Sequence, residues 1–196
     1  MSTNEPQVPS QEALVAATRD SIRKHRTLFL IQGILMVILG IIAVGIPAVA
    51  SVATAIFVGW LFIIGGFIRI VATFTSKGTP GFWWSILIGV LAVIVGFIIV
   101  ANPLEGVLTL TMALIILFVI EGIFQIIAAV EFRKAMASSW VWLIISGIVD
   151  LVLAGLIVAG WPGTAVWALG LLVGINLLFS GIALTMTALA AKDMPS

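Results

Sequence analysis

The chain has 196 residues, of which 62% are hydrophobic and 9% are charged, and its formal net charge is +1. Soluble domains are about half apolar and about a quarter charged, so this composition excludes an ordinary soluble domain. The lack of cysteine excludes disulfides and thiolate metal sites, and a single histidine cannot build a metal site alone. Because uninterrupted apolar runs of about 20 residues recur, we predict an all-α, polytopic membrane protein.

Residues 1–26 are predicted to form a polar, cytoplasmic N-terminal segment. Within it, Ser10 is a candidate helix N-cap and Glu12 falls in the first turn. We therefore expect 10–26 to form an amphipathic helix on the membrane surface, with its basic residues toward anionic lipid. His25 belongs to this basic stretch, and we interpret it as an interfacial residue and not as a metal ligand.

Residues 27–188 are predicted to form a membrane domain of six transmembrane helices. Short turns that contain proline, a residue that resists the helix interior, alternate with longer connections that carry lysine or arginine. The predicted spans are 27–46, 49–74, 83–101, 105–130, 140–160 and 163–188. Residues 189–196 are predicted to form a cytoplasmic C-terminal tail.

The basic residues indicate how the spans are oriented. Eight of the nine lysines and arginines precede the first span, lie in the longer connections or follow the last span. Positive residues are enriched on the cytoplasmic side of a membrane, so we predict that both termini are cytoplasmic. Arg69 is the exception, and it lies near the cytoplasmic end of the second span. Tryptophans at the starts of the third and fifth spans are interpreted as interfacial anchors.

A threefold internal repeat underlies the spans. The outer turns contain the prolines Pro47, Pro103 and Pro162. Nineteen residues after each proline comes a glycine: Gly66, Gly122 and Gly181. Two further glycines precede each proline at similar distances, namely Gly33 and Gly40, Gly89 and Gly96, and Gly147 and Gly155. The pattern predicts three parallel-repeat hairpins, 27–74, 83–130 and 140–188. A pseudo-threefold bundle would result if the hairpins closed around one axis, and the sequence leaves that closure open.

The repeated glycines are expected to let helices approach one another closely. Several are spaced by seven residues, which places them on one helix face, and small residues drive packing between membrane helices. Gly170 and Gly174 add one GxxxG motif. Such stripes serve either a dimer contact or packing within one chain, and we favour packing within the chain.

Six polar side chains inside the spans are the candidate functional residues: Gln32, Arg69, Glu121, Gln125, Asp150 and Asn176. An ionisable side chain in hydrocarbon is costly, so it is a functional-site hypothesis by default. Depths counted from the outer prolines along untilted helices divide the six residues into two layers. The mid-membrane layer holds Asp150, Asn176 and Gln32, and the inner layer holds Glu121, Gln125 and Arg69.

The ionisable members of these layers each have alternative interpretations. Glu121 is predicted to face the bundle interior on the cytoplasmic side, with Arg69 or water as its partner. Arg69 either reaches Glu121 or extends to the membrane interface. Burial disfavours the charged form of a carboxyl group. Asp150 is therefore either a neutral, proton-responsive group that donates to Asn176 or Gln32, or a polar link between the fifth and sixth spans.

Two stretches in the last hairpin point to a known family. They read SGIVDLVLAGLIVAGWP (146–162) and LLVGINLLFSGIALT (171–185), and the earlier segments IQGILMVILGIIAVGIP and IGVLAVIVGFIIVANP repeat their glycine and proline pattern. With these motifs the chain resembles the HdeD-type acid-resistance membrane proteins of bacteria. The resemblance implies six helices in the inner membrane and, for some members, a role in survival of acid stress. Asp150 matches an aspartate of that family, whereas Asn176 stands where an acidic residue is often found.

Two functions follow as hypotheses. The first is a non-enzymatic membrane protein of an acid or general stress response, which acts through its helices or through partners. The second is a small channel or transporter for protons or a small solute that uses Glu121 and Asp150. We expect no enzyme and no cofactor, because the sequence shows no nucleophile–base pairing, metal-ligand cluster or phosphate loop. The expected partners are the lipid bilayer and either a second copy of the chain or another membrane protein, and nucleic acid is not expected.

Overall fold

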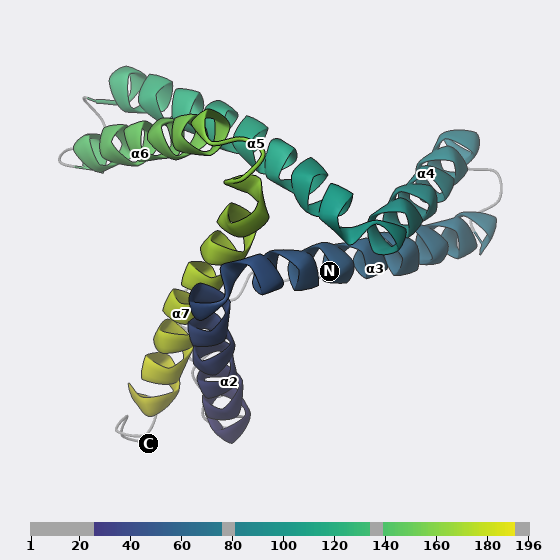
Figure 1. Ribbon diagram of the computed structural model, residues 1–196, viewed down its shortest axis with the longest axis horizontal. Coiled ribbons are helices and arrows are strands. Elements are labelled where there is room, and N and C mark those ends of the chain that lie inside the picture. Colours follow the sequence, from purple (N-terminus) through teal and green to yellow (C-terminus); the bar gives the residue numbers. More distant parts are fainter. Residues whose placement is uncertain (1–25, 76–80, 134–138, 191–196) are drawn as a thin grey trace, which may run out of the picture. The chain divides into compact units, whose positions relative to one another are not determined.

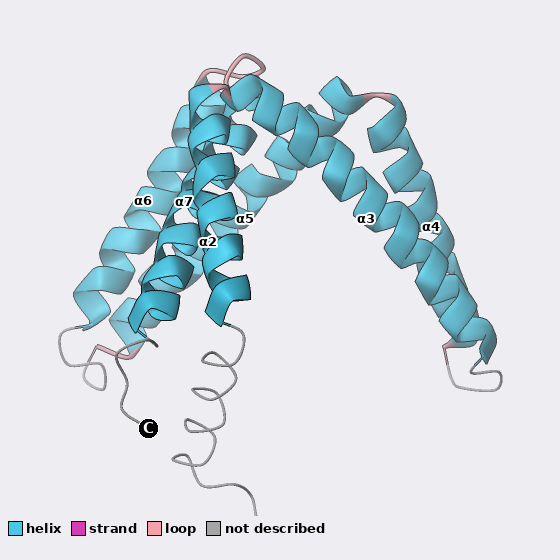
Figure 2. Ribbon diagram, turned by 90° about the horizontal axis from the view of Figure 1, so that it is seen from below, coloured by secondary structure: helices cyan, strands magenta, loops and turns pink. Residues whose placement is uncertain are grey.

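The computed structural model describes residues 26–75, 81–133 and 139–190. Their regular structure is entirely helical (Figure 2), and the helices follow one another along the chain as labelled in Figure 1. The six helices are α2 (Arg26–Gly45), α3 (Pro47–Thr75), α4 (Phe82–Ala101), α5 (Pro103–Glu131), α6 (Ser139–Ala159) and α7 (Ala165–Ala190). Each is long and apolar enough to cross a membrane, which confirms the predicted all-α, six-span architecture.

Predictions about both ends of the chain fall largely outside the described residues. Of the predicted N-terminal segment 1–26, the structure describes only Arg26, which begins α2. At the other end, α7 continues to Ala190, two residues beyond the predicted span, and 191–196 are not described. The surface helix and the C-terminal tail therefore stay predictions.

The prolines of the repeat stand at or shortly before the starts of helices. Pro47 and Pro103 are the first residues of α3 and α5. A proline is tolerated there because the first amides of a helix have no intrahelical acceptor, and its fixed φ suits the helix. The third turn is longer, since Pro162 precedes α7 by three residues and Ala165 N–H donates to Pro162 O at 3.1 Å. The repeat therefore marks helix starts, with extra residues in the last turn.

The closest packing joins helices across the longer connections and not across the proline turns. Two compact units make up the chain, one of residues 43–173 and one that combines the residues up to Ile42 with those from Gly174. In the first unit, α3 lies along α4 and α5 along α6 (Figure 1). In the second, α2 packs against the part of α7 that follows Gly174. Each repeated hairpin thus contributes its two helices to two different pairs.

The repeated glycines lie at these helix contacts, as predicted for packing within one chain. A Cβ atom added to Gly66 would lie 2.7 Å from Gly89 O, and one added to Gly122 would lie 2.7 Å from Gly147 O. A Cβ added to Gly181 would lie 2.8 Å from Gly33 O in the α2–α7 pair. These distances are too short for a side chain, so the backbones touch because the positions are glycine.

Helix α6 departs from the glycine alignment. Gly155 is exposed and would meet nothing within 4 Å if it carried a Cβ. Ala154 is 3% exposed and packs with Ile115 and Ile157. Since Gly147 makes the close contact to α5, the residue on the same face seven positions later is Ala154. The contact stripe of α6 is therefore Gly147 and Ala154, and Gly155 aligns in sequence without taking part.

The helices that follow the prolines meet through small residues in the first compact unit. Gly170 N–H donates to Ser51 Oγ at 2.8 Å, and this contact joins α7 to α3. Thr111 Oγ1 donates to Ala165 O at 3.3 Å and joins α5 to α7. Ser51 and Thr111 are fully buried. Gly170 of the GxxxG motif is thus used inside the chain.

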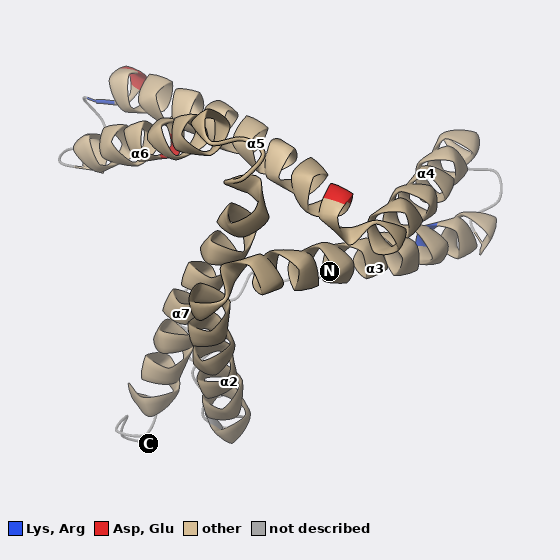
Figure 3. Ribbon diagram, viewed as in Figure 1, with Lys and Arg blue, Asp and Glu red and all other residues tan. Residues whose placement is uncertain are grey.

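Most large apolar side chains are exposed on the isolated chain. Phe67 is 64% exposed and Phe124 is 68% exposed, and both lie well inside their helices. Charged residues are sparse along the helices (Figure 3). A water-soluble protein rarely exposes so much apolar surface, whereas a bilayer solvates it. The chain is therefore a multi-pass membrane protein whose outer surface faces lipid.

Candidate functional site

The candidate site is centred on Gln125 in α5. Glu121 lies one helical turn before Gln125, so the two side chains share a helix face. Gln125 Nε2 donates to Glu121 Oε1 at 3.1 Å. The predicted partner of Glu121 was Arg69 or water in the bundle interior, whereas the described partner is Gln125 of the same helix and Glu121 is exposed.

The same amide also reaches across to α6. Gln125 Nε2 donates to Asp150 Oδ2 at 3.1 Å. A primary amide nitrogen carries two N–H groups, which is enough for one hydrogen bond to each carboxyl group. Gln125 thus bridges two carboxyl groups from two neighbouring spans, and we call Glu121, Gln125 and Asp150 the carboxyl–amide cluster.

The contact between Gly122 and Gly147 positions this cluster. A Cβ added to Gly147 would lie 2.7 Å from Gly122 O and 3.3 Å from Gln125 Cβ. Gly147 therefore leaves the space in which the Gln125 side chain lies. Asp150 follows Gly147 by three residues, which puts it on the same face of α6. Gly147 therefore explains both the close approach of α5 to α6 and the contact between Gln125 and Asp150.

The carboxyl–amide cluster is partly buried. Gln125 and Asp150 are half-buried, and Glu121 is exposed. Gln125 Oε1 is buried and has no hydrogen-bond partner among the described residues. Leaving a buried acceptor unpaired costs roughly 1–3 kcal/mol. The cluster therefore has capacity for one additional hydrogen-bond donor, and its acidic groups lie on both helices.

The predicted division into two layers was wrong for Asp150. It was assigned to the mid-membrane layer, yet it bonds directly to Gln125 of the predicted inner layer. Gln32 and Asn176 belong to the other compact unit, where both are exposed. Asn176 Oδ1 accepts a weak hydrogen bond of 3.5 Å from Ser180 Oγ. Asp150 does link two spans, as one of the alternatives predicted. The helix to which it bonds is α5, however, and not the sixth span.

The layer prediction failed because it assumed untilted helices with a common origin. Helix α5 has 29 residues and α6 has 21. At 1.5 Å per residue these helices are about 43 and 31 Å long, so α5 must either tilt or extend beyond a hydrocarbon core of about 30 Å. In addition, α5 begins at Pro103 whereas α6 ends before Pro162, so their depths were counted from different turns.

Arg69 makes its hydrogen bond to α4 and not to Glu121. Its Nε–H donates to Ser85 Oγ at 3.3 Å. Ser85 also lies 2.9 Å from Thr73 Oγ1. Of the two alternatives for Arg69, the described contacts therefore do not support a pair with Glu121. Sequence reasoning missed Ser85 and Thr73, because a hydroxyl in a span usually bonds to its own helix and gives no distinct signal.

Aromatic residues lie where α4 and α6 begin. Trp83 and Trp84 in the first turn of α4 are 81% and 68% exposed. Arg133 lies over the ring of Trp140, 4.3 Å from its centroid, which is a cation–π contact. No group of three potential metal ligands occurs among the described residues.

Comparison with known sequences supports the repeat and the membrane assignment. Three overlapping segments, 31–101, 87–157 and 149–196, match a family described as a short repeat of unknown function, DUF308. The chain is 27% identical over 168 residues to Protein HdeD of Escherichia coli K12, which covers 84% of this chain and 87% of that protein. Protein HdeD of Escherichia coli O157:H7 and of Shigella flexneri match with the same figures. No solved structure matches.

Proposed function

The chain belongs to the HdeD family of membrane proteins built from the DUF308 repeat, and from this premise we propose a role in the response to acid or general stress. In this proposal the protein is non-enzymatic and lies in the bacterial cytoplasmic membrane. The likeness to the HdeD proteins of enteric bacteria and the six apolar helices support it. The non-enzymatic part rests on the sequence, which pairs no nucleophile with a base.

The observation that carries the proposal is the amide that bridges two carboxyl groups. Gln125 Nε2 lies 3.1 Å from both Glu121 Oε1 and Asp150 Oδ2. Two negative charges so close together repel each other more strongly in apolar surroundings than in water. A proton taken up by either group removes that repulsion. Proton uptake therefore changes the contact between α5 and α6, which makes the cluster a pH-responsive element of the fold.

Acid survival tests this role. Cells that lack the protein are complemented with the wild type, with Glu121→Gln or with Asp150→Asn, and are then counted after an acid challenge. Each variant is expected to fail to restore survival, because a permanently neutral side chain cannot respond to pH. Glu105→Gln is the matched control, since Glu105 is an acid in the first turn of the same helix and lies outside the cluster. Full rescue by both cluster variants would refute the proposed role of the cluster.

A second candidate function is a channel or transporter for protons or a small solute. The cluster favours it, because acidic groups on two spans and an unpartnered buried oxygen can accept a mobile donor. Against it, the six described spans are continuous helices, whereas many transporters bind substrate at broken helices. A flux assay in proteoliposomes across a pH step distinguishes the two functions, and flux no greater than in empty vesicles would remove this candidate.

The proposed orientation has both termini in the cytoplasm. The chain has no cysteine, so single cysteines can be introduced without background. Glu131→Cys and Asn102→Cys lie at opposite ends of α5, and both positions are exposed. In intact cells a membrane-impermeant maleimide is expected to label the cysteine at position 102 and to label position 131 only after lysis. The reverse pattern would contradict the orientation.

A further inference from the structure

Arg69 lies in a closed ring of hydrogen bonds between α3 and α4. Its Nε–H donates to Ser85 Oγ at 3.3 Å, and Thr73 Oγ1 donates to Arg69 O at 2.8 Å. The hydroxyls of Thr73 and Ser85 are 2.9 Å apart. Because Thr73 uses its only hydrogen on Arg69 O, Ser85 must donate to Thr73 and accept from Arg69. The ring has a single direction, and Thr73, which closes it, is 8% exposed.

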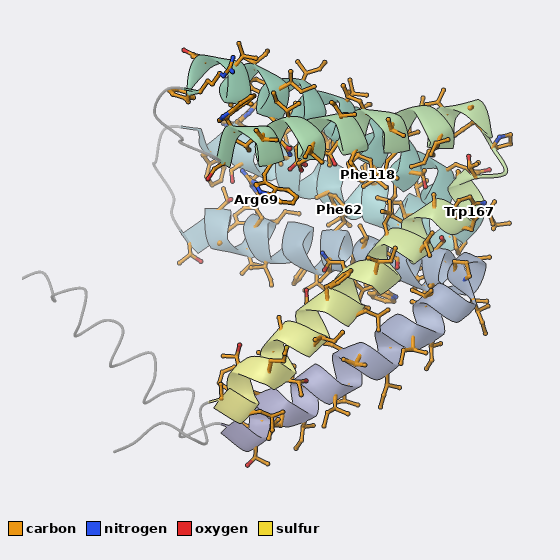
Figure 4. The ribbon with its side chains drawn as sticks, turned by 90° about the vertical axis from the view of Figure 1, so that its left-hand side faces the viewer. Phe62, Arg69, Phe118 and Trp167 are labelled. Carbon is orange, nitrogen blue, oxygen red and sulfur yellow. The ribbon has the colours of Figure 1, made fainter. Side chains whose placement is uncertain are left out.

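This ring fixes one side of the guanidinium and leaves the other side open. A guanidinium has five N–H donors, and the ring uses the one on Nε. The four N–H groups on the two terminal nitrogens have no partner among the described residues. These four form the planar edge that binds a carboxylate or a phosphate through two parallel hydrogen bonds. Arg69 is exposed, so this edge is accessible. Figure 4 labels the residue on the ribbon.

The ring also sets the depth of the guanidinium. Ser85 is the fourth residue of α4, which begins at Phe82. Trp83 and Trp84 in the same turn are 81% and 68% exposed. Exposed tryptophans of membrane proteins concentrate at the level of the lipid headgroups. The open edge of Arg69 therefore lies where phospholipid phosphates are found.

The α5–α6 pair lacks such an open edge. Gln125 occupies the position equivalent to Arg69, twenty-two residues after its own proline, and it bonds to Glu121 and Asp150. Arg133 at the end of that pair lies 4.3 Å from the centroid of the Trp140 ring. Of these two helix pairs, α3–α4 is therefore the one with an arginine whose Nε is held by a hydrogen bond and whose terminal nitrogens are free among the described residues.

We propose that Arg69, held by Ser85 and Thr73, binds the phosphate group of an anionic phospholipid in the leaflet at which α3 ends and α4 begins. The shared chemistry is a tetrahedral phosphate that accepts two hydrogen bonds from the terminal nitrogens. Basic groups between membrane helices are known to hold anionic headgroups. The bilayer supplies this ligand at the depth of the ring, and free phosphate is the other source that the test separates.

Native mass spectrometry of the full chain with added phosphatidylglycerol tests the site. Arg69→Gln is expected to lower the retained lipid roughly tenfold, which corresponds to the loss of one charge-assisted contact. Arg69→Lys keeps the charge without the fork and is expected to retain an intermediate amount. Arg133→Gln removes the same charge near the same membrane face and is expected to leave retention unchanged. Millimolar inorganic phosphate is expected not to displace the lipid.

Three results would overturn the proposal. Wild-type retention by Arg69→Gln would show that the guanidinium does not hold the lipid. An equal loss in Arg133→Gln would mean that only net charge matters, and displacement by inorganic phosphate would assign the site to the free ion. Ser85→Ala keeps the charge and frees Nε, so a smaller loss than that of Arg69→Gln is expected. This variant tests the ring even if Arg69→Gln fails to fold, and wild-type retention by it would refute the role of the ring.

Discussion

Replacing Gly66 with leucine is expected to separate α3 from α4 and to destabilise the protein. A Cβ at this position would lie 2.7 Å from Gly89 O and 3.0 Å from Val93 N, so backbone and not a movable side chain blocks it. Overpacking of a close contact typically costs about 1–3 kcal/mol, and a rigid backbone partner puts this site at the upper end. The measurement is denaturant-induced unfolding in bicelles, followed by tryptophan fluorescence.

The neighbouring glycine provides the control. Gly65 is exposed, and a Cβ there would meet nothing within 4 Å. Leucine at position 65 adds the same volume to the same helix and points to lipid, so the free energy of unfolding is expected to stay close to that of the wild type. Equal destabilisation by Gly65→Leu and Gly66→Leu would show that helix contacts do not explain the glycine repeat.

Much of the fold could be predicted because its signals are local. Continuous apolar runs gave the spans, and the prolines at Pro47 and Pro103 gave the starts of α3 and α5. The glycine spacing of seven residues predicted packing stripes, and Gly66 and Gly122 do contact glycines on another helix. Each of these features depends on a few neighbouring residues, so one sequence is sufficient to reveal it.

The pairing of helices could not be predicted in the same way. The repeat is read through the proline turns, yet α3 packs on α4 and α5 on α6, which are the helices joined by the longer connections. Helix tilt then decides which residues face one another. For this reason the sequence placed Asp150 in a different layer from Gln125, and it aligned Gly155 where Ala154 makes the contact.

The residues of the candidate site were found, but their partners were not. Polar side chains in apolar runs are conspicuous, so Glu121, Gln125 and Asp150 were all identified. That Gln125 bridges the two acids depends on the space left by Gly147, which only the paired helices show. The other two repeats carry Gly65 and Ser180 at the position of Glu121, so the site arose in one repeat of a common scaffold.

Replacing Gln125 with leucine is expected to weaken the contact between α5 and α6. The Gln125 amide donates to Glu121 Oε1 and to Asp150 Oδ2, so leucine removes both hydrogen bonds. Since one hydrogen bond contributes about 0.5–1.5 kcal/mol net, the free energy of unfolding is expected to fall by about 1–3 kcal/mol. Glu105→Gln lies on the same helix outside the cluster and is expected to leave the free energy of unfolding close to that of the wild type. The measurement is denaturant-induced unfolding in bicelles.

A double-mutant cycle between Gln125 and Asp150 tests the central claim most directly, because it isolates the hydrogen bond that joins α5 to α6. The free energy of unfolding in bicelles is measured for the wild type, Gln125→Leu, Asp150→Leu and the double variant. If the amide bonds to the acid, the effects of the two substitutions are expected to depart from additivity by about 0.5–3 kcal/mol. Additive effects would contradict the account.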